Sequence, residues 1–461
     1  MTVESDCPTD DAGLLPGADE ATGADQATGA DQATGADQAT SQDGAGGPGE
    51  PTAKRDRGRL RSAGDGSGAD PTPSGAPFDV PIDLLRARTS EKWRAYGPDV
   101  LPMFVAEMDV VPPTAVADAV DHAVRSGDTG YEHGQVYAEA FAGFAAERFG
   151  WAVDPSTTRT VADVMRGVVE VVRLFTAPGD AVVITPPVYA PFRTHLEHAD
   201  RRVLAAPLTP EGRLDPATLD QALGEARRDG RPAVLLLCQP HNPTGVLHSF
   251  DELRAAGDLA RSHGVRVVAD EIHAAILPTR ADGTRPAFVP TVTAIPDAIA
   301  LHSASKAFNL AGFKAALAVP GPDAVDDLAR LGTPAVHGIS HVASIAHQAA
   351  FRDGGAWLDE VLDALGANAR LLGSLLAARL PAVRWTPGDG TYLAWLDLRD
   401  AGLPEGADPA AFLLEHARVA TVPGPEFGTE GTGFVRFNLA TSPTLVTEAV
   451  DRIAAVLPRH G

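Results

Sequence analysis

Short apolar runs that alternate with helix-like stretches constrain the fold of this chain more than any other feature. Four of these runs, 181–184, 234–238, 265–269 and 298–302, are bounded by proline, glycine or charged residues. Stretches rich in alanine, leucine and glutamate separate them. Runs that are this short and apolar on both faces are typical of parallel strands buried inside an α/β protein. The pattern therefore predicts a three-layer α/β/α large domain with a mostly parallel sheet.

The first 75 residues have a different composition from the rest. In them the hexamer Ala-Thr-Gly-Ala-Asp-Gln recurs from Ala21 to Gln38, and glycine, proline, aspartate and serine surround it. Such a segment cannot bury enough apolar surface to offset the entropy of ordering it. We therefore interpret residues 1–75 as a disordered acidic low-complexity tail.

The remaining residues divide into three segments by pattern. We expect residues 76–120 to form an N-terminal arm and part of a small domain, and residues 121–345 to form the large domain. Residues 346–461 are predicted to be a smaller α+β domain. In this last part of the chain a long helical stretch, Ser344–Leu380, precedes short strands around Tyr392–Leu398 and Phe434–Asn438.

Charge and hydropathy exclude several classes of function. The formal net charge of −23 argues against a nucleic-acid partner, because phosphate binding needs concentrated lysine and arginine. No run of about 18 apolar residues indicates a membrane span, and the acidic N-terminus does not resemble a secretory signal. With only Cys7 and Cys238, no disulfide framework or metal site is predicted. A cytoplasmic protein fits these observations best.

Polar segments follow the four predicted strands, where ligands bind in such sheets. They are Thr185-Pro186-Pro187-Val188-Tyr189, Gln239-Pro240-His241-Asn242-Pro243-Thr244-Gly245, Asp270-Glu271-Ile272-His273 and Ser303-Ala304-Ser305-Lys306. Each segment alone has an ordinary interpretation, such as a turn or a strand cap. Their order and spacing together resemble the fold-type-I pyridoxal-phosphate family, whose members are like aspartate aminotransferase, from about Phe78 to the C-terminus.

This resemblance implies a role for each matched residue. Lys306 would hold pyridoxal phosphate as a Schiff base, and its neutral amine would be the nucleophile. Asp270 would pair with the pyridine nitrogen, so that the ring stays protonated and withdraws electrons. Asn242 would donate a hydrogen bond to the ring hydroxyl oxygen, and Tyr189 would stack on the ring and act in catalysis.

The phosphate of the cofactor needs hydrogen-bond donors. Ser303 and Ser305 are expected to supply hydroxyls, and Val164 and Met165 backbone N–H groups at a helix start. Asp163 beside a dianion is unexpected unless it caps that helix.

Lys314 is the alternative to Lys306 for the imine, and the chain has four lysines altogether. It lacks the Ser-x-Ser-Lys setting after a strand, so a surface or phosphate-side position is expected for it.

Four further segments resemble one branch of the family, the MalY/PatB-like cystathionine β-lyases. Val105-Ala106-Glu107-Met108-Asp109 matches the N-terminal motif of this branch, which implies a substrate contact at Ala106. Gly130-Tyr131 matches a tyrosine that reaches the cofactor phosphate and substrate of the neighbouring subunit. His273 stands where aminotransferases usually have tyrosine, and would tune the ring oxygen. The fourth match is Gly390-Thr391-Tyr392-Leu393-Ala394-Trp395-Leu396-Asp397.

Arg436 is the last match that the family resemblance provides. The alternating pattern Phe434-Val435-Arg436-Phe437-Asn438 predicts a strand, and a guanidinium there would bind the substrate carboxylate with two parallel hydrogen bonds. Two simpler interpretations stay open at this point: Tyr131 as a core aromatic, and His273 as a buried histidine with satisfied hydrogen bonds.

The resemblance implies β-elimination from a cysteine S-conjugate such as cystathionine, giving a thiol, pyruvate and ammonia. An aminotransferase is the alternative, because Asn242, Asp270, Lys306 and Arg436 serve both reactions. A regulatory binding protein built on the same fold is a third hypothesis. A homodimer with a shared active site and a small amino-acid substrate is implied by the family.

Overall fold

The computed structural model describes residues 76–458 of the 461-residue chain. The tail predicted for residues 1–75, with Cys7, lies outside the described residues. All described residues belong to one unit, so the boundaries predicted after residues 120 and 345 stay predictions.

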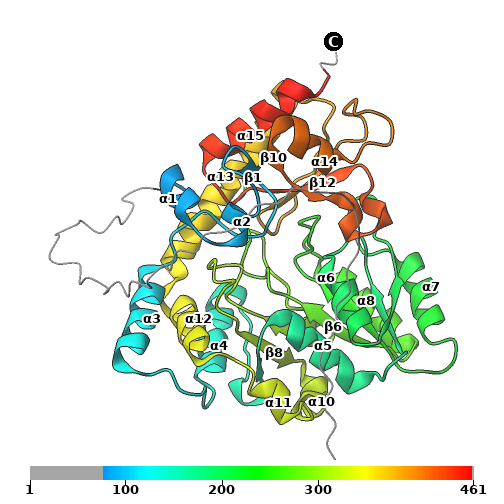
Figure 1. The fold of residues 1–461 in the computed structure, drawn as a ribbon. Helices are drawn as coiled ribbons and strands as arrows, with labels where there is room; N and C mark the ends of the chain where they lie inside the picture. The colour runs from blue at the N-terminus through cyan, green and yellow to red at the C-terminus, as the bar shows by residue number, and fades with distance from the viewer. Residues whose placement is uncertain (1–75, 459–461) are drawn as a thin grey trace, which may run out of the picture. The chain divides into compact units, whose positions relative to one another are not determined.

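A seven-stranded sheet forms the centre of the larger part of the fold (Figure 1). Its strands, in chain order, are β2 (Arg159–Val161), β3 (Ala181–Ile184), β4 (Arg202–Ala205), β5 (Ala233–Cys238), β6 (Arg266–Asp270), β7 (Ile299–His302) and β8 (Ala316–Pro320). The spatial order is β2-β8-β7-β6-β5-β3-β4. The pairs among β3 to β7 are parallel, and β8 is antiparallel to both of its neighbours.

Alternate residues of each strand pack into different layers, because successive side chains of a strand point to opposite faces. Val182 and Ile184 pack with helices α5 (Val164–Phe175) and α6 (Pro191–His198). Ala181 and Val183 pack with α7 (Pro216–Ala226) and α8 (Phe250–Ser262) on the other face. The predicted three-layer α/β/α architecture is confirmed.

A second, smaller sheet contains the C-terminal strands. It has the order β11 (Val422–Pro423), β12 (Phe434–Asn438) and β9 (Leu393–Asp397), all antiparallel. It packs against α15 (Pro443–Val456) and the C-terminal half of α13 (Gly355–Arg379) in one apolar cluster. The short strands β1 (Leu101–Pro102) and β10 (Val419–Ala420) pair in parallel beside it.

The helical stretch predicted from Ser344 to Leu380 is two helices rather than one. Helix α12 (His341–Asp353) ends at Gly354, and α13 begins at the next residue. The chain has no room for a side chain at Gly354, where a Cβ would lie 2.5 Å from the carbonyl oxygen of Ala350 and 2.6 Å from the ring of Phe308. Close packing therefore favours glycine at the junction of the two helices.

Helix α13 is, within residues 76–458, the one helix long and apolar enough to cross a membrane by length and composition. It buries Leu358 and Leu362 in one apolar cluster and Leu372 in another. Its Asp359 forms ion pairs with Arg148 and Arg285. These contacts are those of an interior helix that joins two cores.

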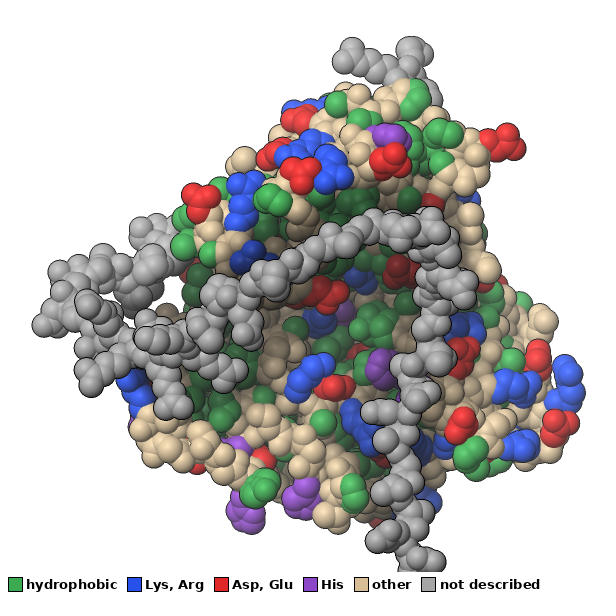
Figure 2. Space-filling model, viewed as in Figure 1, with side chains coloured by type: hydrophobic (Ala, Val, Ile, Leu, Met, Phe, Trp, Pro, Cys, Tyr) green, Lys and Arg blue, Asp and Glu red, His purple; other side chains and the backbone are tan. Residues whose placement is uncertain are grey.

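The other helices and helical turns complete the described chain. The helices are α1 (Ile82–Ala87), α2 (Glu91–Arg94), α3 (Thr114–Ser126), α4 (Val136–Phe149), α9 (Thr291–Ala294), α10 (Val325–Ala329), α11 (Thr333–Val336) and α14 (Pro409–Phe412). The short turns are Pro155–Thr157, Pro322–Ala324, Leu413–Ala417, Gly424–Phe427 and Thr429–Gly431. On the visible part of the face in Figure 2, acidic and basic side chains are interspersed.

Candidate active site

A cavity of about 300 Å³ lies where the carboxyl ends of neighbouring strands meet. Strands β5, β6 and β7 are adjacent in the sheet, so the segments that follow them converge although they are distant in sequence. The wall combines residues of these segments with others from the N-terminal arm, α5, α6 and β12: Val105, Ala106, Asp163, Val164, Met165, Tyr189, Pro191, His195, Cys238, Asn242, Asp270, Ile272, His273, Ser305, Lys306, Ala311, Lys314 and Arg436.

Asp270 is the last residue of β6 and is 4% exposed. One of its oxygens, Oδ1, accepts a hydrogen bond from the backbone N–H of Ile272 at 3.0 Å. Burial, and to a lesser extent the neighbouring Glu271, raises the pKa of Asp270 to about 7. A cationic ligand group in this cavity would favour the charged carboxylate.

Lys306 is partly buried and follows β7 by four residues. Its Nζ donates a hydrogen bond to the carbonyl oxygen of Ala106 at 3.0 Å. Burial lowers the pKa of Lys306 to about 8, and the cation of Arg436 adds to the effect. A substantial fraction of this amine is therefore neutral in mildly alkaline solution, as a nucleophile or a base requires.

Arg436 lies on β12 and is 6% exposed. Its Nη1 donates to Asn242 Oδ1 and its Nη2 to the carbonyl oxygen of Phe104, both at 3.1 Å, whereas its Nε has no partner. Burial lowers the pKa of Arg436 to about 10, so the guanidinium stays charged at neutral pH. The acceptors that it contacts are neutral, which leaves a buried cation suited to an anionic ligand.

Asn242 is held on two sides. Its backbone N–H donates to Cys238 Sγ at 3.4 Å, and its Oδ1 accepts from Arg436. Because the side-chain oxygen is engaged, the amide N–H groups are available to an acceptor in the cavity.

Helix α5 begins at one side of the cavity with Asp163 as its N-cap. Asp163 Oδ1 accepts from the backbone N–H of Arg166 at 2.8 Å, which explains an acid at this position. Val164 and Met165, in the first turn, line the cavity. Lys314 is two-thirds exposed, and its Nζ lies 3.5 Å from Asp163 Oδ2.

The two predicted serines differ in position. Ser305 lines the cavity, whereas Ser303 lies behind it. Ser303 Oγ donates to the carbonyl oxygen of Ala315 at 2.7 Å. The two serine hydroxyls are also 2.7 Å apart. Since Ser303 has one hydroxyl hydrogen and gives it to Ala315, Ser305 donates at their contact.

Two more predicted residues form the aromatic part of the wall. Tyr189 packs edge-on against Phe192 at 5.7 Å, and burial raises its pKa to about 12. His273 is 3% exposed and its Nδ1 has no partner, so this buried histidine is not fully satisfied. Burial lowers its pKa to about 3, which keeps the ring neutral.

Tyr131 is not at the cavity. Its side chain is 97% exposed, in the loop between α3 and α4, so the interpretation as a core aromatic is wrong.

Sequence reasoning missed several residues around the site. Tyr392 Oη donates to the carbonyl oxygen of Ala106 at 2.9 Å. Asn438 Nδ2 donates to the carbonyl oxygens of Val105 and Glu107, each at 2.7 Å. Tyr392 belongs to the segment 390–397 and Asn438 to the predicted strand 434–438, both of which resemble the family. Alternation along the strand places Asn438 on the same face as Arg436.

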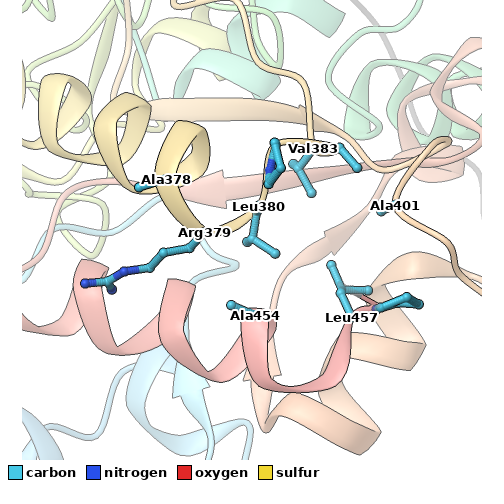
Figure 3. A pocket seen from close by; sticks show the side chains of 10 residues that line it. Ala378, Arg379, Leu380, Val383, Ala401, Ala454 and Leu457 are labelled. Carbon is cyan, nitrogen blue, oxygen red and sulfur yellow. The ribbon is translucent and has the colours of Figure 1, made fainter. Parts of the chain in front are cut away.

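A second cavity, of about 390 Å³, lies between the end of α13 and α15 (Figure 3). Aliphatic side chains such as Leu380, Val383 and Leu457 line it. Its one charged residue, Arg379, forms an ion pair with Asp451. This cavity lacks the titratable groups of the first one.

Within residues 76–458, no group of three or more histidine, cysteine, aspartate or glutamate side chains could hold a metal ion.

The comparisons with known proteins agree with this arrangement. The model of the family "Aminotransferase class I and II" matches residues 103–453. A Mycobacterium leprae protein with a provisional cystathionine beta-lyase name is 47% identical over 82% of this chain and 96% of its own length. The cystathionine beta-lyase PatB of Bacillus subtilis is 33% identical over 80% of this chain and 96% of its own length.

A crystal structure from Corynebacterium diphtheriae, provisionally named a PLP-dependent beta-cystathionase, superposes with a TM-score of 0.76. It is 32% identical and covers 84% of this chain and all of its own. The chain therefore belongs to the class I and II aminotransferase family, in the branch that includes PatB.

Proposed function

We propose that this chain is a pyridoxal-phosphate-dependent carbon–sulfur β-lyase that cleaves cystathionine or another cysteine S-conjugate. The observation that carries the proposal is the meeting of Lys306, Asp270, Asn242 and Arg436 in one cavity. The names of the relatives in its branch support the choice of lyase over aminotransferase.

The donor set of the cavity fits the cofactor. Lys306 offers an amine for the aldehyde, and the buried Asp270 a carboxylate for the ring nitrogen. Asn242 offers amide N–H groups to the ring oxygen, and the unpartnered Nδ1 of His273 lies on the same wall. Tyr189 offers an aromatic face for the ring.

Neutral donors would bind the phosphate. The backbone N–H groups of Val164 and Met165 lie in the first turn of α5, where the positive end of the helix dipole favours an anion. Ser305 could donate its hydroxyl hydrogen to this group only by giving up the hydrogen bond that it donates to Ser303, whose own hydroxyl hydrogen goes to Ala315.

When bound, the cofactor supplies an electron sink for the bonds at the substrate α-carbon. Arg436 holds the substrate carboxylate with two parallel hydrogen bonds, and Val105 and Ala106 close the cavity beside it. Lys306 Nζ, as a free neutral amine, would accept the α-proton. The leaving sulfur needs a proton, which Lys306 Nζ or Tyr189 Oη donates; the raised pKa of Tyr189 keeps its proton in place.

The family resemblance extends the proposal to the assembly. Tyr131 projects into solvent from its loop, as a residue that completes the site of a partner subunit would. We propose a homodimer with shared sites, in the cytoplasm, that acts on a small amino acid.

Product analysis tests the proposed reaction. Purified protein with added pyridoxal phosphate is incubated with L-cystathionine, and homocysteine, pyruvate and ammonia are quantified. The proposal predicts the three products in equal amounts, without a keto-acid co-substrate. Conversion of the cofactor to its amine form, with turnover only when a keto acid is added, would identify an aminotransferase instead.

A further inference from the structure

Residues 104–109, here called the strap, include Val105 and Ala106, which line the cavity, and carbonyl groups that accept hydrogen bonds from its charged side chains. The carbonyl oxygen of Phe104 accepts from Arg436 Nη2 at 3.1 Å. The carbonyl oxygen of Ala106 accepts from Lys306 Nζ at 3.0 Å and from Tyr392 Oη at 2.9 Å. The orientation of these groups therefore depends on where the backbone of the strap is held.

Two asparagines hold the middle of the strap. Asn438 Nδ2 donates to the carbonyl oxygens of Val105 and Glu107. Asn309 pairs with both backbone groups of Met108: its Oδ1 accepts from the N–H at 2.7 Å and its Nδ2 donates to the carbonyl oxygen at 2.9 Å. Through these hydrogen bonds, the two asparagine side chains hold the backbone of the strap from Val105 to Met108.

An ion pair holds the end of the strap. Lys92 Nζ lies 2.9 Å from Asp109 Oδ2, and each of the two side chains is 1% exposed. Lys92 also donates to the carbonyl oxygen of Glu107 at 3.2 Å, and Trp93 Nε1 donates to Asp109 Oδ1 at 2.8 Å. The backbone N–H of Asp109 donates to Ala440.

A fully buried ion pair is weak evidence for stability, because removing both charges from water offsets most of their attraction. The effect of the ion pair on the position of the strap is more definite. The pair joins α2 to the strap at Glu107 and Asp109, the residues immediately before and after Met108. One of the chain's four lysines is thus committed to a contact outside the cavity wall.

We propose that Lys92 and Asp109 are a positioning pair for the carboxylate-binding end of the site. Their contact fixes the strap so that Phe104 orients the guanidinium of Arg436 toward the substrate carboxylate. This inference rests on the proposed role of Arg436. It predicts that loosening the strap weakens the binding of amino acids through their carboxylate more than it weakens binding of the cofactor.

The double variant Lys92→Met with Asp109→Asn tests this. Methionine fills the volume of the lysine stem, and asparagine keeps an acceptor for Trp93, so no buried charge is left unpaired. The matched control, Arg379→Gln with Asp451→Asn, removes an ion pair between α13 and α15 instead. Thermal unfolding of each holoenzyme is recorded first, so that binding is compared between folded proteins.

Binding is measured from the cofactor absorbance while L-alanine, which has no leaving group, is titrated into each holoenzyme. L-alaninol, in which a hydroxymethyl group replaces the carboxylate, is the second probe. The double variant is expected to bind L-alanine about fivefold or more weakly than the parent, the usual effect of one lost hydrogen bond. Its affinity for L-alaninol and for pyridoxal phosphate is expected to stay within about twofold of the parent, and the control variant to match the parent throughout.

Three results would overturn the inference in different ways. A double variant that binds L-alanine as tightly as the parent removes the positioning role and leaves the proposed function intact. Equal losses for L-alanine and L-alaninol remove it too, because the carboxylate is then not the group affected. A parent whose absorbance does not respond to L-alanine contradicts the proposed function, and the role of the pair with it.

Discussion

Replacing Arg436 by methionine isolates the part of the site that binds the substrate carboxylate. Methionine keeps much of the apolar stem and removes the guanidinium, whose Cζ lies 5.1 Å from the centroid of the Phe427 ring. Asn242 Oδ1 and the carbonyl oxygen of Phe104 then lose their donor. Because a buried cation is removed at the same time, the fold is expected to persist.

The expected magnitude follows from the geometry of a guanidinium with a carboxylate. Two charge-assisted hydrogen bonds contribute about 1.5–3 kcal/mol each, so about 3–6 kcal/mol is lost. At about 1.4 kcal/mol for each factor of ten, kcat/KM for L-cystathionine falls by roughly 10²–10⁴-fold. Arg436→Lys, which keeps the charge but not the planar fork, is expected to fall between the parent and the methionine variant.

The assay follows pyruvate release over a range of L-cystathionine concentrations, so that kcat and KM are separated. Cofactor content and thermal unfolding are recorded for each variant, because a loss of cofactor would imitate a loss of substrate binding. A methionine variant that is folded, loaded with cofactor and within about threefold of the parent in kcat/KM would refute the assignment of Arg436.

Three further predictions concern other residues. Asp270→Asn is expected to raise the unfolding temperature of the cofactor-free protein at pH 8 and not at pH 4, as measured by scanning calorimetry. The reason is that burial raises the pKa of Asp270 to about 7. Such an acid stabilises the fold at low pH, and this stability is lost as the pH rises from about 4 to 7. Tyr189→Phe keeps the aromatic face, so kcat is expected to fall by about tenfold or more only if Tyr189 protonates the leaving sulfur; an unchanged kcat in steady-state kinetics assigns this proton to Lys306. Gly354→Ala is expected to lower the free energy of unfolding by about 1–3 kcal/mol in urea titrations, because its Cβ would meet Ala350 and Phe308; an unchanged midpoint would contradict the tight packing of the α12–α13 junction.

Much of the sheet was predictable because buried strands have a simple signature. The run predicted for 181–184 is β3 without any shift, and the run predicted for 265–269 is β6 shifted by one residue. The gathering of Asn242, Asp270 and Lys306 followed from the same pattern, since parallel strands that neighbour one another end at the same edge of the sheet.

Other features could not be predicted because they depend on contacts between distant segments. Asn438 contacts the backbone of Val105 and Glu107 more than 300 residues earlier, and nothing local in its strand distinguishes it from an ordinary polar residue. The lack of room for a side chain at Gly354 depends on the ring of Phe308 from another part of the chain. The buried Lys92–Asp109 ion pair could not be predicted either, because lysine and aspartate side chains are usually exposed.

The identity of the lysine that carries the cofactor tests the account most directly. Borohydride reduction of the holoenzyme links pyridoxal phosphate irreversibly to the amine that holds it, and peptide mapping by mass spectrometry then locates the label. With four lysines in the chain, the alternatives are few. The account predicts one label per chain, on the peptide that contains Lys306. A label on Lys314, Lys92 or Lys54, or a protein that takes up no label after incubation with pyridoxal phosphate, would contradict it.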